Sequence, residues 1–120
     1  MKKILVLLFA MVISLPTFAG LKEKDVIGKW TYKVEIDNQT LTGNFKFEKK
    51  EGKLAGEVIT DDGQTVPFTK VEIKGKITLY LELQPEYEIY KVTLIIENNK
   101  YNGTIALYDG LVPITGEKIE

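Results

Sequence analysis

The sequence predicts an all-β fold, an eight-stranded antiparallel up-and-down barrel that follows an N-terminal signal peptide. Three observations predict it. Apolar and polar residues alternate with a period of two along most of the chain after residue 27, which is typical of strands with one buried and one solvated face. Short turn sequences separate these runs, and no stretch shows a sustained helical period. The alternating pattern also restarts halfway along the chain, which indicates two similar four-stranded halves.

Residues 1–19 have the three parts of a secretory signal peptide. Met1-Lys2-Lys3 is a short basic start, an apolar run extends to Leu15, and Thr17 and Ala19 occupy the small-residue positions before a cleavage site. The apolar run is shorter than the about 20 residues that a membrane-spanning helix needs. We therefore expect cleavage before Gly20, a single mature domain over residues 20–120, no stable membrane insertion after cleavage, and a periplasmic or extracellular location.

The first half, residues 28–74, contains four predicted strands, and residues 21–27 ahead of them can form one short turn of helix. Asp61-Asp62-Gly63 is the strongest turn, because Asp-Gly readily adopts the positive φ angles of a tight hairpin. A change of parity within the fourth strand predicts a bulge near Thr69-Lys70. The apolar rows of the four strands run through residues 30–36, 41–47, 54–60 and 66–73.

The second half, residues 75–120, repeats the pattern of the first at an offset of 47 residues. Eight aligned pairs are identical between Gly28 and Gly63, including Gly56 with Gly103. A four-stranded sheet cannot bury its apolar face alone, whereas two such sheets curling together can, and closure removes exposed strand edges. Convergence of two hairpin pairs on one pattern is the alternative to a true repeat, and it predicts the same barrel. The apolar rows of this half run through residues 77–83, 90–96, 101–107 and 112–119.

Gly28-Lys29-Trp30 opens the first predicted strand after a short lead-in. This opening resembles the Gly-x-Trp motif of the calycins, the lipocalin and avidin group of barrels. The resemblance implies that the Trp packs across the barrel floor beneath a basic residue from near the chain end, for which Lys118 is the candidate. Repeated apolar-x-Gly strands, as in Leu54-Ala55-Gly56 and Tyr101-Asn102-Gly103, also resemble those of small exported bacterial lipocalin-like modules. The resemblance covers residues 28–118 and constrains the fold more than the function.

The composition excludes several kinds of site. The chain has no His, Cys or Arg, and its one Ser, Ser14, lies in the signal peptide. The usual general base, thiol and serine nucleophiles and zinc ligands are therefore missing. Without Lys2 and Lys3, 14 Lys face 17 Asp and Glu, a net charge of −3 that disfavours nucleic-acid binding. Carboxylate pairs such as Asp61-Asp62 lie at turns and lack the spacing of a calcium loop. We expect no enzymatic activity, cofactor or metal.

Two surfaces remain as candidate binding sites. The interior carries bulky side chains, whose volume favours a filled barrel; a small cavity near one mouth is the alternative. The candidate ligand-binding residues are Trp30, Tyr32, Phe45, Phe47, Phe68 and Tyr90. The outer face of the second half carries few charges, and such an apolar stripe can dock a partner unless the lead-in segment 21–27 folds across it. The candidate partner-surface residues are Tyr80, Ile89, Ile95 and Tyr108.

These observations predict an exported, non-enzymatic binding module for a small apolar ligand or a protein partner. The alternative is a protein-inhibitor or structural accessory module that acts by surface contact alone. The sequence leaves the ligand, the partner and the oligomeric state open.

Overall fold

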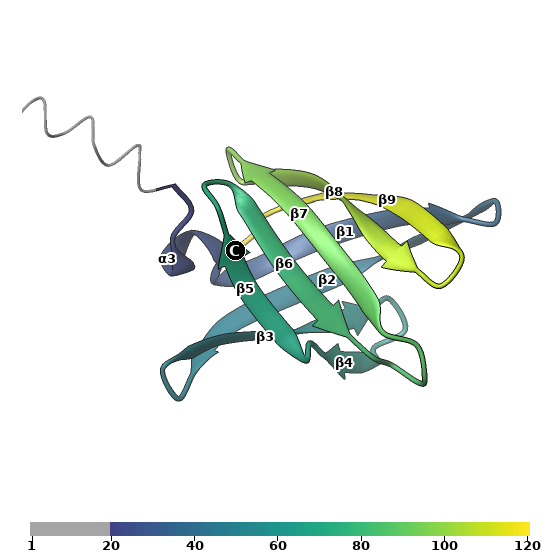
Figure 1. Cartoon of the computed structure of the whole chain (residues 1–120), viewed down its shortest axis with the longest axis horizontal. Helices are drawn as coiled ribbons and strands as arrows, with labels where there is room; N and C mark the ends of the chain where they lie inside the picture. Colours follow the sequence, from purple (N-terminus) through teal and green to yellow (C-terminus); the bar gives the residue numbers. More distant parts are fainter. Residues whose placement is uncertain (1–19) are drawn as a thin grey trace, which may run out of the picture.

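The computed structural model describes residues 20–120, so the predicted signal peptide at residues 1–19 lies outside the described residues. Within the described part, one short helix precedes nine strands (Figure 1). The elements are α3 (Glu23–Val26), β1 (Gly28–Ile36), β2 (Gln39–Lys50), β3 (Lys53–Thr60), β4 (Thr65–Pro67), β5 (Lys70–Lys74), β6 (Thr78–Leu83), β7 (Tyr90–Glu97), β8 (Lys100–Leu107) and β9 (Gly110–Glu117).

The strands form one curled antiparallel sheet in the order β4-β3-β2-β1-β9-β8-β7-β6-β5. Strands that follow each other in the chain lie side by side, apart from β4 and β5 at the two edges. The first and last strands, β1 and β9, are neighbours in the middle of the sheet, where Lys33 pairs with Thr115 and Val34 with Ile114. The all-β, antiparallel, up-and-down architecture predicted from the alternating pattern is therefore confirmed.

The sheet has nine strands rather than the expected eight, because the expected fourth strand is divided between two neighbours. β4 pairs with β3, whereas β5 pairs with β6. The chain changes neighbour at Phe68 and Thr69, whose N–H groups donate to the Gly56 carbonyl at 2.9 Å and the Glu82 carbonyl at 2.7 Å. Pro67, which has no N–H to donate, ends β4. The change in alternation near Thr69-Lys70, from which a bulge was predicted, marks the point where the chain passes from one edge of the sheet to the other.

Two hairpins depend on residues that tolerate positive φ. Asp37 and Asn38 join β1 to β2 with φ of 49° and 63°, and Asn98 and Asn99 join β7 to β8 with φ of 53° and 61°. Asn and Asp enter the left-handed region more readily than other non-glycine residues, and two such residues in succession match the twist of the flanking strands. These turns fix the register of the long hairpins.

The lead-in segment and Trp30 seal one end of the sheet. The helix predicted within residues 21–27 is present as α3, and Val26 at its end is fully buried. The indole Nε1 of Trp30 donates to the Val26 carbonyl at 2.9 Å. The Lys118 ammonium lies 5.8 Å from the centre of the indole ring and donates to the Asp25 carbonyl at 3.2 Å. The arrangement that the Gly-x-Trp resemblance implies, a Trp beneath a basic residue from near the chain end, is therefore present.

Large side chains fill the interior above this floor. The buried group includes Trp30, Phe47, Leu79, Leu94, Ile96 and Tyr101. Tyr101 is 4% exposed, and its hydroxyl donates to the Thr31 carbonyl at 2.8 Å, so this buried polar group is satisfied. Burial raises the pKa of the Tyr101 hydroxyl far above its ordinary value. The expectation of a filled interior thus holds for the sealed end of the molecule.

Candidate ligand-binding site

The opposite end of the interior contains a cavity of about 240 Å³. It lies where β1, β6 and β8 end and where β2 and β7 begin. Four hairpin loops surround its mouth, at residues 37–38, 61–64, 84–89 and 108–109, and Figure 1 shows the β1–β2, β6–β7 and β8–β9 loops together at the right, away from α3. The cavity is lined by Tyr32, Val34, Ile36, Leu41, Phe45, Val58, Phe68, Leu83, Tyr90, Val92, Ile105, Leu107 and Ile114.

Four of the six predicted ligand-binding residues line this cavity, namely Tyr32, Phe45, Phe68 and Tyr90. The other two, Trp30 and Phe47, belong to the packed region near the floor and are 1% and 2% exposed. The sequence identified the inward-facing aromatic residues but not their depth. A strand pattern tells which face a side chain occupies, whereas its height in the barrel depends on the stagger between strands.

Aromatic rings form one wall of the cavity. The rings of Tyr32 and Phe45 stack at 5.1 Å between centroids, and Phe45 meets Phe68 edge-on at 5.6 Å. Branched aliphatic side chains from β1, β2, β3, β6, β7, β8 and β9 complete the lining. Such a surface offers dispersion contacts and removal from water, so it suits an apolar group.

The polar groups of the lining are the hydroxyls of Tyr32 and Tyr90. The absence of a side chain at Gly43 leaves room for the Tyr32 ring. A β-carbon at position 43 would lie 2.6 Å from the Tyr32 hydroxyl oxygen and 2.5 Å from the Ile59 carbonyl oxygen. Burial raises the pKa of Tyr32, and the carboxylates of Asp61 and Asp62 raise it further. The neutral phenol is therefore the form present at neutral pH, and it can donate or accept one hydrogen bond toward a ligand.

Exposed apolar side chains gather around the mouth. Tyr87 is 94% exposed, Tyr108 89%, Leu111 69%, Ile89 47% and Leu41 46%. Ile89 and Tyr108 were predicted as surface residues from the sequence, whereas Tyr87, Leu111 and Leu41 were not. The predicted up-and-down topology would have indicated them, because alternate turns of such a sheet lie at the same end. The turns after β1, β6 and β8 therefore lie together, and all five residues are in or near these turns.

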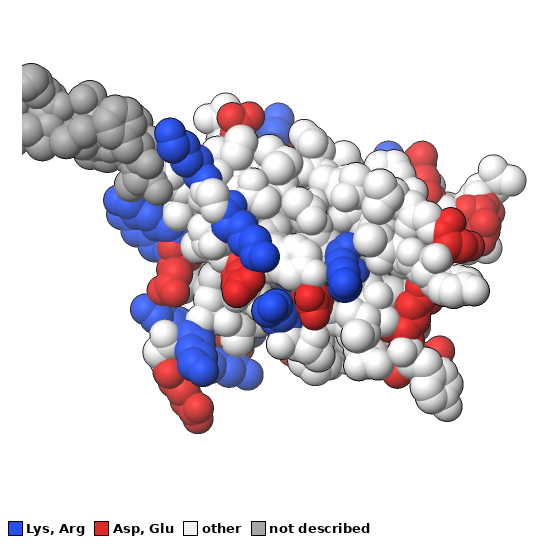
Figure 2. Space-filling model, viewed as in Figure 1, with Lys and Arg blue, Asp and Glu red and all other residues white. Residues whose placement is uncertain are grey.

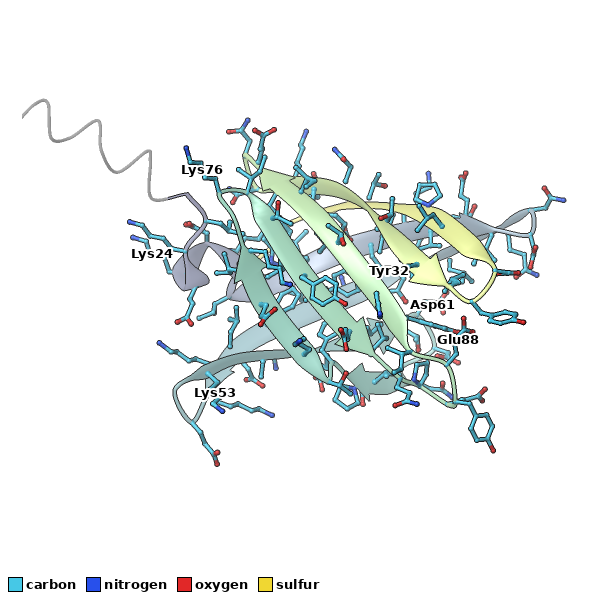
Figure 3. The ribbon with its side chains drawn as sticks, in the orientation of Figure 1. Lys24, Tyr32, Lys53, Asp61, Lys76 and Glu88 are labelled. Carbon is cyan, nitrogen blue, oxygen red and sulfur yellow. The ribbon has the colours of Figure 1, made fainter. Side chains whose placement is uncertain are left out.

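The mouth is also acidic. Its four loops carry Asp37, Asp61, Asp62, Glu86, Glu88 and Asp109, and they contain no Lys. The turns and termini at the sealed end carry most of the lysines that lie outside strands. Figure 3 places Lys24, Lys53 and Lys76 at that end and Asp61 and Glu88 at the other. On the face shown in Figure 2, most lysines lie toward the sealed end, whereas carboxylates lie at both ends. The molecule is therefore polarised along the barrel.

The four residues predicted as a partner surface do not form one patch. Ile89 and Tyr108 lie at the mouth, whereas Tyr80 and Ile95 are half-buried on β6 and β7. The Tyr80 hydroxyl donates to the Glu82 carboxylate at 2.6 Å, which raises the pKa of Tyr80 to about 12, and the Lys74 ammonium lies 4.8 Å from the ring centre. The lead-in segment 21–27 does not cover the outer face of β6 and β7. It lies instead at the sealed end, where the Leu21 N–H donates to the Lys76 carbonyl.

Residues 20–120 contain neither a candidate metal-ion cluster nor a candidate membrane-spanning helix. No cluster of three or more Asp, Glu, His or Cys side chains is placed to hold a metal ion within them. Among the same residues, no helix has the length and apolarity to cross a membrane.

The chain is similar in fold to solved β-barrels. A redesigned β-barrel matches with a TM-score of 0.62 at 16% identity, covering 82% of this chain and 95% of that one. The redesigned β-barrel mFAP1 bound to DFHBI matches with a TM-score of 0.60 at 15% identity, over 81% and 97%. The Schistosoma mansoni fatty acid binding protein in complex with arachidonic acid matches with a TM-score of 0.56 at 12% identity, over 82% and 98%. The sequence matches no protein-family profile and no curated protein. At these identities the likeness shows the fold alone, a β-barrel of the kind found in fatty-acid-binding proteins.

Proposed function

We propose that the protein is an exported, non-enzymatic binding protein that holds a small apolar ligand in the cavity at the open end. One observation carries the proposal. The interior is packed at the floor, yet about 240 Å³ at the other end is left unfilled behind an almost wholly apolar lining. An empty apolar space forfeits packing energy, so a chain that retains one gains from filling it with a ligand.

The size of the cavity limits the ligand. A dry apolar cavity of about 150 Å³ accepts benzene, and most drug-sized ligands occupy about 300–1,000 Å³. The cavity here lies between these values, so it suits a compact ring system or the end of an alkyl chain whose remainder projects through the mouth. Two barrels of similar fold are solved with small molecules bound, DFHBI and arachidonic acid, which supports a ligand-binding role for this fold.

Export is part of the proposal and rests on the sequence of residues 1–19. A barrel that works outside the cytoplasm without disulfides needs its stability from packing and strand pairing, which the sealed end supplies. The location is tested by fractionating the native host and determining the N-terminus of the protein recovered, which we expect to be Gly20.

Binding is tested by titrating the purified mature protein with the neutral dye 1-aminoanthracene, whose fluorescence rises in apolar surroundings. We expect saturable binding at one site. Val92→Phe places a ring in the cavity and should weaken binding at least about tenfold, which corresponds to about 1.4 kcal/mol. Thr93→Phe is the matched control, because neighbouring strand residues point to opposite faces, and it should bind like the unmodified protein. No saturable binding, or equal binding by both variants, would contradict the proposal.

The second candidate is a module that acts by surface contact, and the exposed tyrosines at the mouth favour it. Tyr87 and Tyr108 are among the most exposed large residues of the described chain. Tyrosine at an exposed tip is a common anchor in protein interfaces. A protein that fails to take up the dye but retains a stoichiometric partner through purification, and loses it on Tyr87→Ala with Tyr108→Ala, would favour this function over ligand binding.

A further inference from the structure

We propose that the cavity selects amphiphiles with a positively charged head, such as a quaternary ammonium, over amphiphiles with a carboxylate head. This inference rests on the proposed function, since it concerns the polar end of the ligand whose apolar part occupies the cavity. Three features of the mouth carry it.

The first feature is the charge of the loops. Six carboxylates stand on the four loops of the mouth, and these loops supply no cation. The ion pairs formed within residues 20–120 join Lys49 to Glu23, Lys50 to Glu48 and Lys74 to Glu72, so none of them neutralises a carboxylate of the mouth. Lys33 and Lys91 are the lysines of β1 and β7 nearest these loops in sequence, and both are exposed rather than part of the cavity lining. A ligand head at the mouth therefore meets a negative potential.

The second feature is that this potential reaches the cavity. Tyr32 lines the cavity; burial raises its pKa, and the carboxylates of Asp61 and Asp62 raise the pKa further by disfavouring the phenolate. Figure 3 shows Tyr32, Asp61 and Glu88 toward the same end of the molecule. The negative charges of Asp61 and Asp62, which disfavour a phenolate at this position, also disfavour a ligand carboxylate and favour a cation.

The third feature is the choice of groups available to hold a head. The lining contains no Lys, so a carboxylate would find two phenol hydroxyls and no countercharge. A cation would find the carboxylates of the loops together with the exposed rings of Tyr87 and Tyr108. Aromatic faces attract quaternary ammonium groups, which adds a contact that an anion cannot make.

The test compares three ligands that share one decyl tail and differ in the head: decyltrimethylammonium, decanol and decanoate. Each competes with 1-aminoanthracene at neutral pH and low ionic strength, below its micelle-forming concentration. We expect affinity to fall from the ammonium through the alcohol to the carboxylate, with at least about a tenfold ratio between the two ions, about 1.4 kcal/mol. The ratio should shrink at about 1 M salt, where the Debye length is about 3 Å.

Charge removal locates the effect. Asp61→Asn, Glu86→Gln and Asp109→Asn combined should lower the ratio of ammonium to carboxylate affinity several-fold while leaving the affinity for decanol unchanged. The matched control, Glu51→Gln, Glu97→Gln and Glu120→Gln combined, removes the same net charge at the sealed end and should leave the ratio as it was.

The outcomes separate the two proposals. If neither the dye nor decanol binds, the proposed function fails. If both bind and decanoate equals or exceeds the ammonium, or if the two charge-removal variants behave alike, the cavity binds apolar ligands and the charge selectivity proposed here is wrong.

Discussion

Adding one methylene group at two buried valines should change stability in opposite directions. Val92 is 2% exposed and lines the cavity at the open end, whereas Val26 is fully buried in the packed floor beside Trp30. Val92→Ile extends into unfilled space. Val26→Ile must displace neighbours that already touch. Both substitutions retain β-branching, so the contrast reports the space around the side chain.

The expected magnitudes follow from these surroundings. Burying one further methylene without displacement contributes about 0.8 kcal/mol to the free energy of unfolding, so Val92→Ile should stabilise the protein by about that much. Inserting the group into a packed core costs about 1–3 kcal/mol, so Val26→Ile should destabilise it by that range. For a domain of this size, about 1 kcal/mol corresponds to a shift in Tm of roughly 4–8 °C.

Urea unfolding of the mature protein measures both effects. Trp30 is the single tryptophan and is 1% exposed, so its fluorescence reports the loss of the floor. An unchanged m-value would show that the substitutions alter stability and not the extent of unfolding. Equal destabilisation of the two variants would mean that no usable space adjoins Val92, and the reasoning about the cavity would then be refuted.

Three further substitutions test other parts of the structure. Gly43→Ala should lower the free energy of unfolding by about 1–3 kcal/mol and weaken dye binding, because the new methyl group forces the Tyr32 ring to move; unchanged dye affinity would contradict this placement. Tyr80→Phe should remove one ionisation near pH 12 from the absorbance titration at alkaline pH. The variant should also lack the part of the stability that the raised pKa of Tyr80 supplies, which is present below pH 10 and lost toward pH 12. Lys118→Met should destabilise the protein by about 1–2 kcal/mol and alter the emission of Trp30, because it removes the cation over the indole and a charge-assisted hydrogen bond to the Asp25 carbonyl. An unaltered emission spectrum would argue against the contact between Lys118 and the indole.

The strand pattern predicted most of the architecture because the information it needs is local. Alternation fixes which face of a strand is buried, and turn residues such as Asn98 and Asn99 fix where a strand ends. The floor of the barrel followed from the resemblance, which supplied Trp30 and Lys118 as partners 88 positions apart in the chain, a pairing that alternation alone does not give. The proposed repeat of two halves stays a prediction.

Properties that depend on non-local geometry escaped the sequence analysis. The parity change near Thr69 was visible, but the choice of neighbour on each side of it depends on the edges that closure brings together. The depth of Phe47 and Phe68 depends on the stagger between strands, so one fills the floor and the other lines the cavity. The rim of the mouth was missed because Tyr87 and Leu111 lie in or beside turns, where alternation carries no signal.

The contrast between the two ends has a topological origin. In an up-and-down sheet the lead-in segment and the chain terminus both arrive at the end where β1 starts and β9 finishes, and there α3, Trp30 and Lys118 together close the barrel. Within the described residues, the other end receives hairpin loops. The packed floor and the cavity therefore lie at opposite ends of the same strands. Substitutions in the loops at residues 61–64 and 84–89 can alter the charge and shape of the mouth without loosening the floor, so ligand preference should change with these loops while the fold is retained.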